Sequence, residues 1–178
     1  MKTLIAAVGL LAATGCLHRA PSLPAPIPKI EGESRVAFAL RYTEIAVGTG
    51  RLVEPRKCIY AHYTGWLTDG KKFDSSRDTT NDGKPRTPIS FPQGARRVIA
   101  GWDLGFDGMR VGGRRRLFIP YQLGYGEAGR PPVIPPKAEL IFDVELMAVA
   151  ETLPRPEPTP RGQPAPPPRC ADWADVAR

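Results

Sequence analysis

The stretch 62–76 constrains the fold of this chain more than any other part of the sequence. It reads His-Tyr-Thr-Gly-Trp-Leu, then Thr-Asp-Gly, then Lys-Lys-Phe-Asp-Ser-Ser. Two aromatic-rich runs on either side of an Asp-Gly step predict a β-hairpin. Strand alternation places Tyr63 on the inward face, and the second run brings Phe73 and Asp74 close behind it. A hydroxyl, an apolar ring and a carboxylate, with no obvious nucleophile, favour a pocket that binds and distorts a ligand.

Proline marks two segments that are expected to lie outside the folded part. Twelve of the 21 prolines fall within 21–28 and 154–168. Proline removes a backbone donor and favours extended, solvated chain, so these segments are typical of linkers or tails. We therefore expect a tether at 17–33, one folded domain at 34–151 and a proline-rich C-terminal tail at 152–178. The domain is long enough to bury a single core.

The first sixteen residues predict an export signal. Lys2 precedes an apolar run at 4–13, and small residues then lead to Cys16. This run is too short to span a membrane, and its pattern resembles the lipobox of bacterial lipoproteins, in which the cysteine is acylated. The alternative is a plain secretory signal with an incidental cysteine. We expect a periplasmic protein of the cell envelope, and Leu17 after the lipidated Cys16 favours an anchor in the outer membrane.

The other two cysteines leave three alternatives open. In an oxidising compartment, Cys58 and Cys170 could form a disulfide that pins the tail, remain free thiols, or pair with another chain. Metal binding is not expected, because the three cysteines, His18 and His62 lack the spacing of a ligand pair.

Hydrophobic periodicity predicts an α+β domain. A half-buried strand begins near residue 34, where Val36, Phe38 and Leu40 alternate with other residues, and it continues in the same style to 47. Glycines weaken the one helical segment, 98–109, to two or three turns. Together with the hairpin, further strands are predicted at 57–67, 89–91, 114–119 and 139–149. An antiparallel sheet wrapped around one short helix would bury these apolar faces.

Six short motifs then occur in order along the chain. They are His-Tyr-Thr-Gly at 62–65, Lys-Phe-Asp-Ser-Ser at 72–76, Val-Ile-Ala-Gly-Trp at 98–102, Gly-Tyr-Gly at 124–126, Ile-Pro-Pro at 134–136 and Ile-Phe-Asp-Val-Glu-Leu at 141–146. Over about 42–149 the chain closely resembles the FKBP-type peptidyl-prolyl cis-trans isomerases, the immunophilins that bind macrolides such as rapamycin. With the N-terminal pattern, the resemblance points to a bacterial, exported lipoprotein form of this family.

The resemblance implies a curved antiparallel sheet of five or six strands around one helix, with a pocket between them. Trp102 would form the floor on which a proline ring rests, and Ile89 stands where the family usually has an aromatic residue. The catalytic positions implied are Tyr63, Phe73, Asp74, Trp102, Tyr125 and Phe142, and the substrate-binding positions are Ile89, Val98, Ile99 and Ile134.

The chemistry of prolyl isomerisation suits these residue types. Rotation about an X–Pro bond faces a barrier of about 18–20 kcal/mol, because the amide loses resonance at the twisted midpoint. No bond is cut, so no nucleophile, metal or cofactor is required. By the resemblance, the Ile99 backbone N–H and the Tyr125 hydroxyl would hold substrate carbonyls, while Asp74 would orient polar groups and keep Tyr63 in place.

Partners follow from the same resemblance. We expect proline-containing polypeptides and macrolides as ligands, a membrane contact through the lipid anchor, a monomer, and no nucleic acid. The arginine run 114–116 is interpreted as a solvated edge or a site for anionic lipid. We interpret Arg96, Arg97 and Arg130 as a basic rim of the pocket that favours acidic residues beside the proline of a substrate. A proline-binding or chaperone module with incidental isomerase activity is the alternative function.

Overall fold

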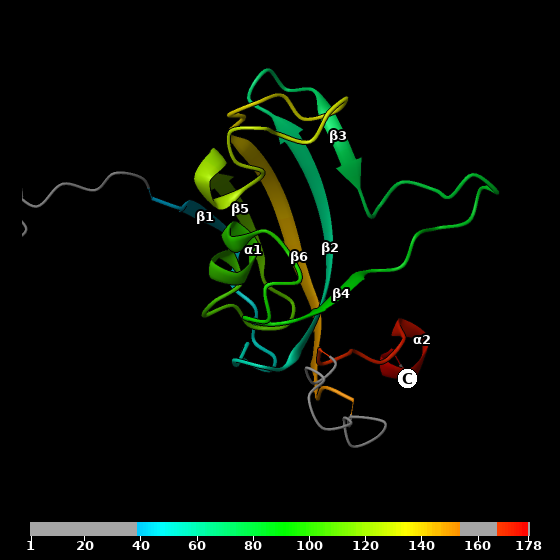
Figure 1. Cartoon of the computed structure of the whole chain (residues 1–178). Coiled ribbons are helices and arrows are strands. Elements are labelled where there is room, and N and C mark those ends of the chain that lie inside the picture. Colours follow the sequence, from blue (N-terminus) through cyan, green and yellow to red (C-terminus); the bar gives the residue numbers. More distant parts are fainter. Residues whose placement is uncertain (1–38, 154–166, 178) are drawn as a thin grey trace, which may run out of the picture. The chain divides into compact units, whose positions relative to one another are not determined.

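The computed structural model describes residues 39–153 and 167–177. The expected signal, Cys16, the tether and the strand positions Val36 and Phe38 lie outside these residues. The helices and strands, shown in Figure 1, are β1 (Arg41–Ala46), β2 (Cys58–Leu67), β3 (Lys72–Ser75), β4 (Ile89–Pro92), α1 (Ala100–Gly105), β5 (Arg114–Ile119), the 3-10 turn η1 (Tyr121–Leu123), β6 (Leu140–Ala150) and α2 (Trp173–Val176).

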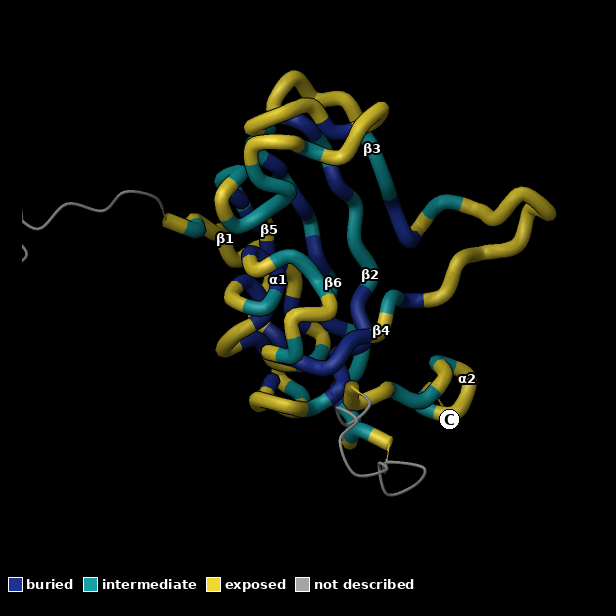
Figure 2. Tube along the Cα trace, in the orientation of Figure 1, coloured by how far each residue is buried: buried dark blue, intermediate teal, exposed yellow. Residues whose placement is uncertain are grey.

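The described strands form one antiparallel sheet of six strands that curves around α1, which confirms the predicted α+β class (Figure 1). The strand order is β1-β5-β6-β2-β3, and β4 also pairs with β2. β2 and β6 form the long central ladder. β3 pairs with β2 at 64–66 and β4 pairs with β2 at 58–61, so the two short strands share one edge. The polar loop between them projects away from the sheet and is largely exposed (Figure 2).

Helix α1 is shorter than the expected 98–109 and lies directly on β5. A Cβ atom at Gly101 would come within 2.4 Å of the Ile119 side chain, and one at Gly105 within 2.5 Å of Leu117. These glycines, which weaken the helix in isolation, therefore allow its backbone to approach the sheet. Among the described residues, no helix is long and apolar enough to cross a membrane.

The arginine run is only partly a solvated edge, and the prediction was wrong for Arg115. Arg114 and Arg116 are exposed, but Arg115 shares the inward face of β5 and is only 3% exposed. Its guanidinium donates to the carbonyls of Gly105 (2.6 Å) and Asp107 (3.0 Å) at the end of α1, and it pairs with the Glu44 carboxylate. Helix ends leave carbonyls unsatisfied, and a buried cation needs acceptors, so each satisfies the other.

Strand β1 forms where alternation predicts a strand, but it is not half-buried. All six of its residues are exposed, including Tyr42 (54%) and Ile45 (44%). β1 pairs only with β5 and is an edge strand of the sheet, whereas α1 packs on β5 itself. The apolar core therefore lies on the inner strands.

The outer face of β2 is covered by residues 167–177. Cys58 and Cys170 form a disulfide, which decides among the three alternatives for these cysteines. The Tyr60 hydroxyl donates to the carbonyl of Ala171 at 2.8 Å, and the Tyr60 and Trp173 rings lie 5.8 Å apart. Tyr60 is fully buried as a result, although it lies on the face opposite Ile59.

Candidate active site

A hollow of about 230 Å³ opens between α1 and the concave face of the sheet. It collects side chains from four strands, from α1 and the three residues before it, and from the loop after η1. Nine of the site residues expected from sequence line it: Tyr63, Phe73, Asp74, Ile89, Val98, Ile99, Trp102, Tyr125 and Phe142. The tenth, Ile134, is buried and lines an adjoining hollow of about 330 Å³, which shares Phe73, Asp74, Tyr125 and Arg130 with the first.

The interior of the pocket is a cluster of aromatic rings. Trp102 is 5% exposed, and its ring centroid lies 4.9 Å from that of Tyr63 and 5.2 Å from that of Phe142. Phe73 stands against Phe142 at 5.4 Å. All three pairs are edge-to-face, which is a favourable arrangement for aromatic rings.

Gly65 makes room for these rings on β2. A Cβ atom there would come within 2.7 Å of both the Phe142 and the Phe73 rings. Because real Cβ atoms are not found so close to ring carbons, a larger residue would displace two walls of the pocket. The glycine of the His-Tyr-Thr-Gly motif is therefore a requirement of the pocket's shape.

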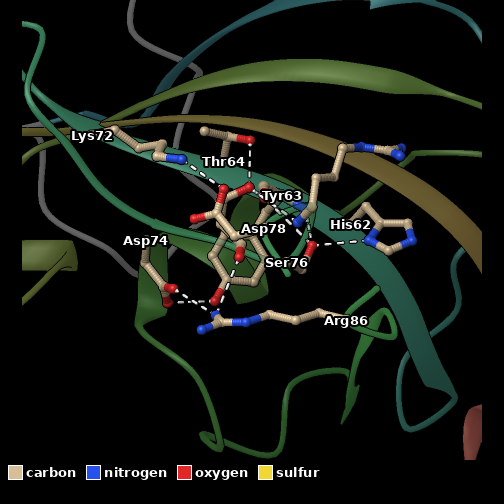
Figure 3. A network of polar contacts seen from close by, with 10 residues as sticks. His62, Tyr63, Thr64, Lys72, Asp74, Ser76, Asp78 and Arg86 are labelled. Atoms are coloured by element: carbon tan, nitrogen blue, oxygen red, sulfur yellow. Dashed lines mark hydrogen bonds and ion pairs between the residues drawn. The ribbon is translucent and has the colours of Figure 1, made fainter. Parts of the chain in front are cut away.

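Tyr63 and Asp74 form the polar side of the pocket (Figure 3). The Tyr63 hydroxyl donates to Asp74 Oδ2 at 2.5 Å. Burial, together with this hydrogen bond and the carboxylate charge, raises the pKa of Tyr63 well above its ordinary value. The phenol therefore stays protonated, and remains a donor to Asp74, throughout the neutral and mildly alkaline range. The backbone beneath it is held by Ser76, whose hydroxyl accepts from the Tyr63 N–H at 2.8 Å.

Arg86 is a pocket neighbour that sequence reasoning missed. Its guanidinium lies 3.4 Å from Asp74 Oδ1, as Figure 3 shows. It also donates to the Ser75 carbonyl at 3.2 Å. Arg86 belongs to the polar loop between β3 and β4, and no local pattern indicates which of that loop's side chains returns to the sheet. Both oxygens of Asp74 are therefore engaged before any ligand binds.

The expected basic rim is present in part. Arg97 and Arg130 line the pocket, and the Arg130 guanidinium lies 5.8 Å from the centroid of the Tyr125 ring. Arg96 is exposed, has a φ of 55° and is not among the lining side chains. Within the described part of the chain, neither the Ile99 backbone N–H nor the Tyr125 hydroxyl has a hydrogen-bond partner, and the buried indole Nε1 of Trp102 has none either.

Comparison with known proteins agrees with this geometry. Residues 50–147, more than half of the chain, match the family model of the FKBP-type peptidyl-prolyl cis-trans isomerases. An FK506-binding protein of Neisseria meningitidis is 48% identical over 61% of this chain and 94% of its own length. FK506-binding protein 4 of Dictyostelium discoideum is 49% identical over 63% of this chain, which spans only 29% of that longer relative.

A solved structure extends the likeness to three dimensions. The crystal structure of AtFKBP13 is 38% identical and superposes with a TM-score of 0.55, covering 62% of this chain and 93% of the other. The six-stranded sheet, its short helix and the ordered motifs thus agree with the family match. The chain belongs to the family of FKBP-type peptidyl-prolyl cis-trans isomerases.

Proposed function

We propose that this protein catalyses the cis–trans isomerisation of X–Pro bonds in polypeptides by binding the prolyl segment in its aromatic pocket. The observation that carries the proposal is the convergence of Tyr63, Phe73, Trp102 and Phe142 on one hollow between helix and sheet. The hollow offers aromatic rings to a pyrrolidine ring, and polar side chains also belong to its lining. Such a site suits a substrate that is apolar at the ring and polar at the amide next to it.

The proposed mechanism is selective binding of the twisted amide. A planar amide is more polar than a twisted one, because resonance places charge on its oxygen and nitrogen. An apolar cup lined by Trp102 and Phe142 therefore disfavours the planar ground state more than the twisted transition state. An interaction that is stronger in the transition state lowers the barrier, whereas equal binding of both states does not.

Polar groups would guide the rotation. The Ile99 N–H and the Tyr125 hydroxyl are available to donate hydrogen bonds to substrate carbonyls, as described above. Asp74, held by Tyr63 and Arg86, would orient the polar surroundings of the rotating carbonyl. In this scheme the rings of the pocket provide most of the binding and Asp74 has a positioning role.

Replacing Asp74 by alanine is expected to lower kcat/KM by about two- to tenfold, the effect of one or two hydrogen bonds, and to leave macrolide binding largely intact. The comparison is between kcat/KM for a prolyl peptide and the Kd of a macrolide. Asp78→Ala is the matched control, because Asp78 is paired with Lys72 at 2.6 Å and does not line the pocket. Equal losses in turnover and macrolide binding would contradict a positioning role.

The activity itself is tested by the rate of cis-to-trans exchange in a proline-containing peptide. We expect purified protein to accelerate this exchange, which takes tens of seconds or more without a catalyst, and a macrolide of the rapamycin type to block the acceleration. An exchange rate that stays at the uncatalysed value would rule out the enzyme proposal.

A binding or chaperone module with incidental isomerase activity is the alternative. To distinguish the two functions, the pocket is filled, for example by Ile89→Trp at its rim. Both isomerisation and the suppression of aggregation are then measured on this variant. Loss of isomerisation with unchanged suppression of aggregation would assign the chaperone activity to another surface. Loss of both would assign both to the pocket.

We further propose that the protein works in the cell envelope, in the periplasm, where it assists protein folding as a monomer anchored by a lipid on Cys16. The Cys58–Cys170 disulfide supports an oxidising compartment, in which such bonds form and persist. The apolar run at 4–13 supports export. Mass spectrometry of the mature N-terminus tests both cleavage before Cys16 and its acylation, and an unprocessed Met1 would contradict them.

A further inference from the structure

Two arginines at the pocket have no acidic partner. Arg97 and Arg130 are both exposed and line the hollow. Within residues 39–153 and 167–177, no carboxylate lies within ion-pair distance of either guanidinium. Lys72 and Lys137, in contrast, are each paired with a carboxylate: Lys72 with Asp78 at 2.6 Å, and Lys137 with Glu127 at 3.5 Å.

The one acidic side chain of the pocket does not offset these charges. Asp74 already faces Arg86, so this pair contributes no net charge. The other charged side chains of the lining are Arg97 and Arg130, so the lining together with Arg86 has a net charge of +2. A substrate that reaches the aromatic cup therefore does so past two unpaired cations.

The two arginines differ in position. Arg97 lies directly before Val98 and Ile99, which precede α1 and also line the aromatic pocket. Arg130 comes from the loop after η1 and lines both the cup and the adjoining hollow that contains Ile134. A polypeptide with its proline in the aromatic pocket and one flank in the second hollow would pass Arg130. Its other flank would pass Arg97.

We infer that these arginines select the sequence around the proline. The preferred substrates carry carboxylate side chains within one or two positions of the proline, on both sides of it. This inference rests on the proposed isomerase function and names its substrate class. Because both guanidinium groups are solvent-exposed, their effect is on encounter and orientation and depends on ionic strength.

The test uses four peptides of one length with the cores Gln-Pro-Gln, Glu-Pro-Gln, Gln-Pro-Glu and Glu-Pro-Glu, each corrected for its own uncatalysed rate. At low salt we expect each glutamate to raise kcat/KM about threefold, the size of one exposed ion pair. We expect the preference to shrink strongly at about 0.5 M salt. Arg97→Gln and Arg130→Gln should each lower the ratio of Glu to Gln peptides, and the double variant should bring it to about one.

Arg96→Gln is the matched control. It removes the same charge from the adjacent position, outside the pocket lining, so the preference for glutamate should persist if the pocket arginines are responsible. Equal kcat/KM for all four peptides, or a preference unchanged in the double variant, would overturn the inference while leaving the isomerase function intact. Acceleration of none of the peptides would overturn the proposed function and, with it, this inference.

Discussion

Replacing Phe73 by alanine is expected to lower kcat/KM for a prolyl peptide by about 10- to 100-fold. Phe73 is half-buried, and its ring forms a wall of the pocket against Phe142. Full burial of a phenylalanine side chain contributes about 1.5–3 kcal/mol, and each 1.36 kcal/mol of transition-state stabilisation corresponds to a factor of ten. The measurement is the catalysed exchange rate of one peptide, with the folded fraction determined separately by urea unfolding.

Phe118→Ala is the control for this variant. Phe118 is also half-buried, but it lies on β5 between Leu117 and Ile119, which face the core, so its ring is on the outer side of the sheet. The same atoms are removed, and kcat/KM should change by less than about twofold because the pocket is untouched. Equal losses from both variants would mean that Phe73 acts through the stability of the fold.

Trp102→Ala should also abolish most of the rate, but it removes a core residue and is expected to cost about 3–5 kcal/mol of folding free energy.

Removing the Cys58–Cys170 disulfide is expected to lower the free energy of unfolding by about 4 kcal/mol. The bond joins residues 112 positions apart, and closing a loop of this length restricts the unfolded chain strongly. It also fixes residues 167–177 over Tyr60. Urea unfolding of a Cys58→Ala/Cys170→Ala variant measures the loss, with Cys16→Ser in both proteins so that only this pair differs.

Tyr60→Phe is the comparison variant, because Tyr60 belongs to the same contact between β2 and residues 167–177 as the disulfide. It removes only the hydrogen bond to Ala171 and should cost about 1 kcal/mol. The pocket lies on the other face of the sheet, so kcat/KM of the folded fraction should be unchanged in the disulfide variant. A loss of stability no larger than that of Tyr60→Phe would contradict the role of the disulfide as the main attachment of this segment.

The sequence predicts those features that depend on local pattern. The hairpin at β2 and β3, the strands and the single central helix follow from alternation and turn residues. The site positions were implied by the family resemblance that the ordered motifs carry, and nine of the ten line one pocket. The buried Arg115 could not be predicted in this way, because its acceptors are Glu44, 71 positions away, and the end of α1.

Long-range contacts explain the other differences. Arg86 reaches Asp74 from a polar loop whose composition indicates only exposure. Residues 167–177 are held over β2 by the Cys58–Cys170 disulfide and by a hydrogen bond from the Tyr60 hydroxyl to Ala171. The sequence around Cys58 and Tyr60 does not indicate these distant partners. The exposure of β1 follows from its place at the sheet edge, which alternation along a single strand does not reveal.

The close packing of α1 on β5 has a consequence for the thermodynamics of ligand binding. Gly101 and Gly105 lie directly on the Ile119 and Leu117 side chains, so at these two positions no side chain of the helix itself separates its backbone from the sheet. The indole of Trp102 is therefore already fixed before a ligand arrives, and little conformational entropy is lost at the floor on binding. We therefore expect the ordering that a substrate imposes in the loops at 76–88 and 124–138 rather than at the floor of the pocket.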